Sequence, residues 1–323
     1  MTPTATVAPM LTGELAKIIR VFPRRTKWTP TDPLAFVGHP PLIRPDADEV
    51  HVSCTFTWDI PEAERLALAW AQHYPRVLLG GPAITPAKYV VPAFIPGMYL
   101  RRGVTFTTRG CNDRCPWCLV PEREGRLQVI DDFPEGPVIQ DNNFLQATAT
   151  HRSRVYQMLN RQMVACFTGG LDSALLTDQV ADELRGVNLR EVFLAADTAG
   201  SLKPLVKAIR RLSFLRDPAE DRKGEAARAI RCYVLIAYNG EGLAQAEARL
   251  DRVWELGAVP FAMLYQPPDR YINYRKEAPE WATLQRKWDR PAAMFASHRC
   301  SPATSSVGAS PRTPRELPPC TTW

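Results

Sequence analysis

The sequence lacks the features of membrane-spanning, secreted and fibrous proteins. It has no run of about 18 apolar residues, which a membrane-spanning helix would require. Its start, MTPTATVAPMLTGELAK, lacks the basic-then-apolar order of a signal peptide, so we expect a cytoplasmic protein without a membrane partner. The 323 residues are 45% apolar and 23% charged, which excludes a mainly disordered chain and allows one large or two ordinary domains.

A strong excess of one charge is also missing. The formal net charge of +6 over 323 residues is a weak indication of a nucleic-acid partner. Basic and aromatic side chains that could grip phosphate and stack on bases cluster in one proline-rich loop, namely Arg24, Arg25, Lys27 and Trp28. The same four residues are equally compatible with a solvated surface, so a nucleic-acid partner stays an open alternative.

Proline-rich stretches delimit the organisation of the chain. Residues 23–47 predict an extended loop, and the Pro, Ser and Thr composition of residues 301–323 predicts a disordered tail. We therefore expect an N-terminal extension over residues 1–99, a main domain over 100–292 and a disordered C-terminal tail over 293–323.

The N-terminal extension contains one regular unit. A strand-like run over 49–57 is followed by a helical pattern from Ile60 to Tyr74 and by a second strand-like run over 76–81. Strand, helix and strand in this order predict a small Rossmann-like βαβ unit with parallel strands.

From residue 104 onward, strand-like runs alternate with amphipathic helical patterns. Six such runs occur, at 104–108, 137–141, 164–168, 191–197, 232–238 and 259–265. Helical patterns lie between the later ones, at 171–186, 202–215 and 242–257. The fold class is therefore α/β, and six units predict a partial (β/α)6 barrel of the TIM type rather than the closed barrel of eight.

Three of the eight cysteines lie close together in the segment TTRGCNDRCPWCLVPE (107–122). Cys111, Cys115 and Cys118 have the spacing C-x-x-x-C-x-x-C, which suits a metal centre better than disulfides in a cytoplasmic protein. Three thiolates on one loop can bind three corners of an iron–sulfur cubane and leave its fourth iron open. A structural zinc site needs four ligands, and no second C-x-x-C or His pair stands at suitable spacing.

This segment, with Trp117 directly before the third cysteine, resembles the signature of the radical S-adenosylmethionine (radical SAM) enzymes. It follows the first strand of a six-unit partial barrel, as it does in that family, and the resemblance covers about residues 100–290. It implies a [4Fe–4S] cluster on the three cysteines, with SAM on the unique iron, and an external electron donor of the flavodoxin or ferredoxin type. Reductive cleavage of SAM would give methionine and a 5′-deoxyadenosyl radical, which abstracts hydrogen from an unidentified substrate. SAM could be consumed, recycled or used as a methyl donor.

The same resemblance implies SAM contacts at the ends of the predicted strands, although it assigns no catalytic side chain. Loop packing for Trp117, helix capping for Asp141 or Asn142 and a core position for Ile236 are the alternative interpretations. If the six strands lie in sequence order, the candidates line one mouth, with adenine towards Tyr238. The expected SAM-contacting residues are Trp117, Asp141, Asn142, Gly169, Asp197, Ile236 and Asn239.

Residues 48–82 look like the second half of the cobalamin-binding domain that precedes the barrel in one branch of the family. That domain supplies a histidine through an Asp-x-His-x-x-Gly motif, but none of His39, His51 and His73 has an Asp two residues before it. We therefore predict a truncated relative that supports the barrel or covers the substrate, without bound cobalamin. The alternative function is a non-catalytic iron–sulfur or zinc-binding module, with nucleic acid as its possible partner.

Overall fold

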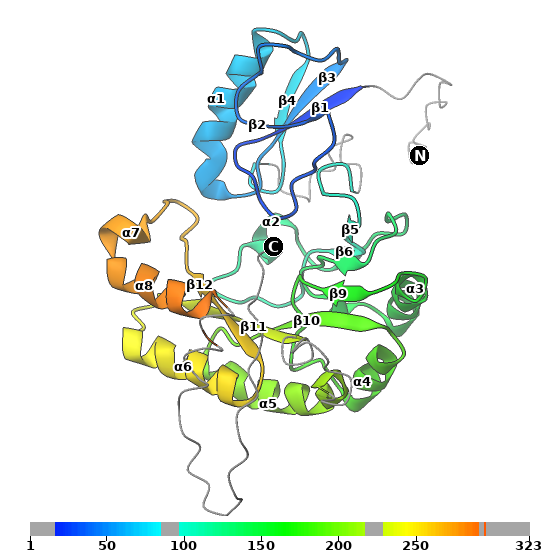
Figure 1. Ribbon diagram of the computed structural model, residues 1–323, viewed down its shortest axis with the longest axis vertical. Coiled ribbons are helices and arrows are strands. Elements are labelled where there is room, and N and C mark those ends of the chain that lie inside the picture. The colour runs from blue at the N-terminus through cyan, green and yellow to red at the C-terminus, as the bar shows by residue number, and fades with distance from the viewer. Residues whose placement is uncertain (1–16, 85–96, 217–228, 291–293, 295–323) are drawn as a thin grey trace, which may run out of the picture.

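The computed structural model describes residues 17–84, 97–216, 229–290 and Met294. These residues form a smaller N-terminal unit above a larger one (Figure 1). Almost all of the predicted C-terminal tail lies outside the described residues. None of the helices in these ranges is long and apolar enough to cross a membrane.

The N-terminal unit is a parallel sheet with the strand order β2-β1-β3-β4, covered by one helix. The predicted strand, helix and strand are present as β3 (Glu49–Ser53), α1 (Ile60–Ala71) and β4 (Val77–Gly80). Helix α1 begins with a proline in its first turn and buries Leu66 and Trp70 against the sheet. Two strands were not predicted, β1 (Ile18–Phe22) and β2 (Ala35–Val37), so the expectation of a loop throughout 23–47 is wrong for β2.

The larger unit contains all six predicted strands in one parallel sheet. They are β5 (Val104–Thr105), β8 (Val138–Ile139), β9 (Ala165–Phe167), β10 (Leu189–Ala195), β11 (Ile230–Ile236) and β12 (Val259–Leu264). The strands lie in sequence order, and β5 and β12 are the two edges in the described part of the sheet. The α/β class is thus confirmed, while the sheet of the described residues is open and does not confirm the barrel.

Helices cover one face of this open sheet (Figure 1). Residues of β11 alternate, with Cys232, Val234 and Ile236 buried among apolar side chains of α5 and α6. The helices are α3 (Ala149–Leu159), α4 (Asp178–Arg185), α5 (Leu202–Arg211), α6 (Leu243–Glu255) and α8 (Pro279–Trp288). The alternation follows from the two-residue repeat of a strand, and it places Tyr233 on the opposite face.

Short elements carry the chain between β5 and β8. These are β6 (Thr108–Arg109), which pairs antiparallel with β7 (Gln128–Val129), and the single turn α2 (Val120–Arg123). Another short helix, α7 (Tyr274–Glu277), precedes α8.

The two units meet through the carboxyl ends of their parallel strands. Trp58, which follows β3, contacts Tyr271, which follows β12, with ring centroids 6.2 Å apart. Arg123 of α2 donates to the backbone carbonyl of Ala83 in the segment after β4. The N-terminal unit therefore lies over the strand ends of the larger sheet (Figure 1).

Candidate functional site

The three clustered cysteines lie on the loop between β6 and α2. All three are free and half-buried. Gly110 has a φ of +78°, and a Cβ there would come within 2.3 Å of the carbonyl oxygen of Arg126. Glycine is thus required directly before Cys111, where the chain turns back on itself. The Cys111 amide then donates to the Gly125 carbonyl, over 3.1 Å, which draws the two ends of the loop together.

The carboxylate of Glu124 holds this loop in place through hydrogen bonds. Its side chain is buried, and it accepts from the Gly110 amide at 3.1 Å and from Arg109 at 2.5 Å. It also accepts from the Asn142 amide group at 2.6 Å, which joins the cysteine loop to the segment after β8. A buried carboxylate with three donors holds its surroundings firmly, because each donor would be left unpaired by its loss.

A second set of polar side chains contacts the loop from the segment after β8. Asp113 accepts from Asn143 at 3.1 Å and from Gln146 at 2.9 Å. The side-chain amide of Asn143 also lies 3.9 Å from the sulfur of Cys111. Its carbonyl oxygen Oδ1 is buried and has no hydrogen-bond partner among the described residues.

The three thiols influence one another electrostatically. Burial raises the pKa of Cys115 to about 11, and the negative charges of Cys118, Asp113, Cys111 and Asp197 act in the same direction. Burial is also the main cause that raises the pKa of Cys111 and of Cys118. Three thiols that resist becoming anions together form a donor set suited to a positively charged, thiophilic centre.

The thiols do not converge on one point. Within the described residues, no three His, Cys, Asp or Glu side chains stand close enough together to hold a single metal ion. An iron–sulfur cubane has a different requirement, because each thiolate binds a separate iron of a larger body. The described residues therefore form no ready site for one zinc ion, whose thiolate ligands share a metal at about 2.3 Å, and a cluster on the three cysteines stays a prediction.

Asp197 lies beside the cysteine loop, as the predicted strand order requires. It follows β10, and its Oδ1 accepts from the Leu235 amide at 3.2 Å. Burial raises its pKa, while the Leu235 amide, the charge of Arg249 and a hydrogen bond from Trp117 oppose that effect. Its charge in turn raises the pKa of Cys115 and Cys118, which lie on the same side of the sheet.

Arg249 of α6 fixes the strand ends around Asp197. Its side chain is 5% exposed, and the guanidinium donates to the carbonyl oxygens of Asp197 at 2.5 Å and of Leu235 at 2.7 Å. Glu241 balances the charge through two contacts of 2.6 and 2.7 Å. One buried cation thus joins the carboxyl ends of β10 and β11.

Aromatic side chains extend the site along the strand ends. Trp117 meets Tyr238 edge to face at 5.6 Å, and Tyr238 meets Tyr265 at 4.8 Å. Asn239 is exposed in the turn after β11, where its φ is +53°. Ile236 is fully buried in the core and its carbonyl accepts from the Tyr265 amide at 3.0 Å, so its predicted contact with SAM stays a prediction.

The remaining candidates lie at the ends of β8 and β9. Asp141 is 1% exposed, and its two oxygens accept from the amide and the hydroxyl of Thr107, each at 2.6 Å. This gives Asp141 a structural role in joining the ends of β5 and β8, and its SAM contact stays a prediction. Gly169 packs so closely on the neighbouring backbone that a Cβ would lie 1.9 Å from the Asp141 carbonyl oxygen.

Sequence reasoning missed Glu124, Asn143 and Arg249. A signal was present for Arg249, which interrupts the apolar stripe Ala246, Leu250 and Val253 of α6 and therefore had to find buried acceptors. For Glu124 and Asn143 no spacing rule distinguishes them from surface residues.

The basic loop of the N-terminal unit is partly committed to the fold. Arg24 forms a two-pronged ion pair with the buried Asp59, and the ammonium of Lys27 lies 4.7 Å from the ring centre of Trp28. The predicted nucleic-acid contact of this loop stays a prediction.

Comparisons with known proteins bear on the fold. No family model and no curated protein matches the chain. Among solved structures, it is similar to the radical S-adenosylmethionine methyltransferase TsrM from Kitasatospora setae, determined with tryptophan substrate and the SAM analogue aza-SAM bound. The TM-score is 0.51 at 13% identity, over 77% of this chain and 72% of that one. The two proteins share a fold. At this identity the similarity supports a shared architecture, and the chemistry has to be argued from the site residues.

Proposed function

We propose that the chain is a radical SAM enzyme. The observation that carries the proposal is the position of three neighbouring thiols at the carboxyl ends of a six-stranded open parallel sheet. The shared fold with a radical SAM methyltransferase supports the same conclusion. Parallel α/β proteins bind their ligands at this end of the strands.

In this proposal Cys111, Cys115 and Cys118 hold a [4Fe–4S] cluster. When bound and reduced by a flavodoxin- or ferredoxin-type donor, the cluster supplies the electron that cleaves SAM and yields the 5′-deoxyadenosyl radical. Asp197 offers a carboxylate beside the cysteines for a polar group of SAM. The rings of Trp117 and Tyr238 offer apolar surface for adenine. Asn142, Gly169 and Asn239 border the same strand ends, while cobalamin is not part of the proposal.

In this proposal the N-terminal unit covers the mouth and would limit the access of water to it. It lies over the strand ends and contacts α2, which directly follows Cys118 (Figure 1). Exclusion of water protects a reactive radical from side reactions. The substrate class is left to the reaction assay, because a shared fold does not fix it.

Replacement of one cysteine tests the proposal. Anaerobic reconstitution with iron and sulfide should give a brown protein with about four irons per chain, which forms 5′-deoxyadenosine with dithionite and SAM. Cys115→Ser should lose the cluster and the product, because only three protein thiolates hold it. The matched control is Cys54→Ser, since Cys54 is buried in the N-terminal unit and contacts the Phe56 carbonyl. A Cys115→Ser protein that keeps four irons would contradict the ligand assignment, and a colourless zinc protein would favour the binding-module alternative.

A further inference from the structure

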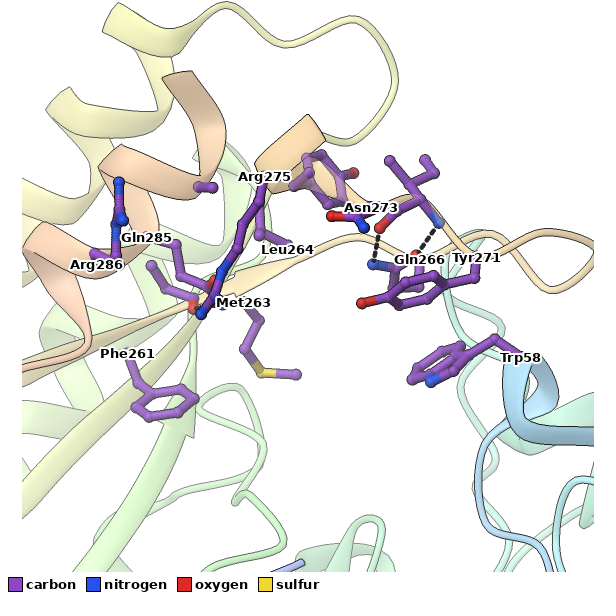
Figure 2. Close-up of a pocket in the computed structure, with 14 residues that line it drawn as sticks. Trp58, Phe261, Met263, Leu264, Gln266, Tyr271, Asn273, Arg275, Gln285 and Arg286 are labelled. Atoms are coloured by element: carbon purple, nitrogen blue, oxygen red, sulfur yellow. Dashed lines mark hydrogen bonds between the residues drawn. The ribbon is translucent and has the colours of Figure 1, made fainter. Parts of the chain in front are cut away.

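A cavity of about 580 Å³ lies at the open edge of the larger sheet, against β12. Figure 2 shows its walls: Phe261 and Met263 from β12, Trp58 from the N-terminal unit, and Tyr271 from the segment after β12. Its size is that of a small-molecule site, and its walls are largely apolar and aromatic, as such sites are. Both units contribute to it.

Two arginines supply the charge of this cavity. Arg275 of α7 and Arg286 of α8 line it, and no Asp or Glu is among the described residues of its lining. Neither arginine has a carboxylate partner in the described part of the chain, and Arg286 donates only to Thr283 on its own helix. The neighbouring cations differ, because Arg270 is paired with Glu277 at 2.7 Å and Lys287 with Glu247 at 2.5 Å.

The aromatic wall is held in place by the backbone. Both atoms of the Gln266 amide bond to Ile272, which donates at 2.8 Å and accepts at 3.0 Å (Figure 2). This clamp closes the segment that carries Tyr271 and sets that ring against Trp58. Trp58 in turn stacks on Phe56 at 4.8 Å. A ligand would therefore find its ring contacts already formed, which lowers the entropic cost of binding.

The cavity adjoins the cysteine site without belonging to it. Tyr274, which lines the cavity, donates from its hydroxyl to the Tyr265 carbonyl at 2.7 Å. The ring of Tyr265 contacts Tyr238, which meets Trp117 of the cysteine loop. Tyr265 and Tyr238 therefore lie between the cavity and that loop.

We infer that this cavity binds a small aromatic anion, a flat ring that carries a carboxylate or a phosphate. Trp58, Tyr271 and Phe261 provide ring contacts, and Arg275 and Arg286 provide guanidinium groups, which can bind a carboxylate or a phosphate. This binding requires neither the cluster nor SAM, so it can be tested independently of the proposed radical chemistry.

Calorimetric titration of the full reconstituted chain tests the inference. The first probe is indole-3-propionate, and its matched control is indole-3-propionamide, which has the same shape without the charge. Phenyl phosphate is the second anion and separates phosphate from carboxylate. We expect saturable binding of at least one anion and no comparable binding of the neutral amide.

Single substitutions locate the site. Arg275→Gln should weaken anion binding by at least about tenfold, and Arg286→Gln should act in the same direction. Lys276→Gln is the matched control, because it removes a neighbouring exposed charge outside the cavity lining and should leave the affinity unchanged. Trp58→Leu should weaken both anions through lost ring contact.

The inference is overturned if neither anion binds, if the amide binds as well as the propionate, or if Arg275→Gln binds like the wild type. Circular dichroism of the variants excludes misfolding as the cause of a loss. Formation of 5′-deoxyadenosine by the same preparation reports separately on the proposed function.

Discussion

Two aspartates at strand ends lie in different surroundings in this protein. Asp141, after β8, is buried and bonded to Thr107, whereas Asp197, after β10, lies beside the cysteines. The sequence places both acids after strands, and the strand order follows from the alternating pattern. It cannot say which carboxylate turns inward, because that depends on whether a donor such as Thr107 stands within reach of the side chain.

A third aspartate predicts a pH dependence of stability. Burial raises the pKa of Asp289 to about 7 from its ordinary value of 3.8, and its Oδ1 is buried without a hydrogen-bond partner among the described residues. It also ends α8, where the helix dipole disfavours an anion. Because the folded-state pKa is raised, the stability that Asp289 contributes is complete below about pH 4 and is lost as the pH rises through 7.

Asp289→Asn should therefore be more stable than the wild type at pH 8, by on the order of 1–2 kcal/mol after allowance for partial exposure, and should differ little at pH 4. Urea unfolding at both pH values measures the difference. Asp182→Asn, on the exposed face of α4, should show no such change between the two. An equal effect of Asp289→Asn at both pH values would contradict the assigned pKa.

At the scale of elements, the strands of the larger unit could be predicted because each is an apolar run bounded by polar turns. β2 was missed because three residues among prolines give no readable period, although pairing with β1 makes them a strand. The position of the cysteine loop followed from the strand that precedes it. Its anchoring did not, because Glu124 meets Gly110 and Asn142 only after the chain has folded.

The anchor gives a prediction about the loop. Glu124→Gln removes the charge that Arg109 and the Gly110 amide share, and should lower the free energy of unfolding by about 1.5–3 kcal/mol. The reconstituted variant should also lose iron faster to a chelator, because the cysteine loop is less firmly held. Glu122→Gln, in helix α2 just before Glu124 and exposed, should match the wild type in both measurements. Iron loss at the wild-type rate would show that Glu124 does not position the cysteines.

At the scale of the whole molecule, two parallel sheets direct their carboxyl ends at each other. The sequence indicated both sheets, yet their mutual orientation rests on contacts between residues far apart in the chain, which no local pattern records. Arg123 is the clearest example. It lies five residues after Cys118, and it bonds to the Ala83 carbonyl of the N-terminal unit.

Arg123 therefore couples the N-terminal unit to the cysteine loop, and its removal should destabilise both. Arg123→Gln loses a hydrogen bond with a charged donor and should lower the free energy of unfolding by about 1.5–3 kcal/mol. Hydrogen exchange of the backbone should become faster on both sides of the contact, in the loop 109–120 and in the segment 81–84, and change little in the distant helix α4. Arg65→Gln provides the control, because Arg65 is exposed on α1 and pairs with Glu62 of its own helix. Faster exchange confined to 81–84 would mean that the N-terminal unit contacts the cysteine loop without stabilising it.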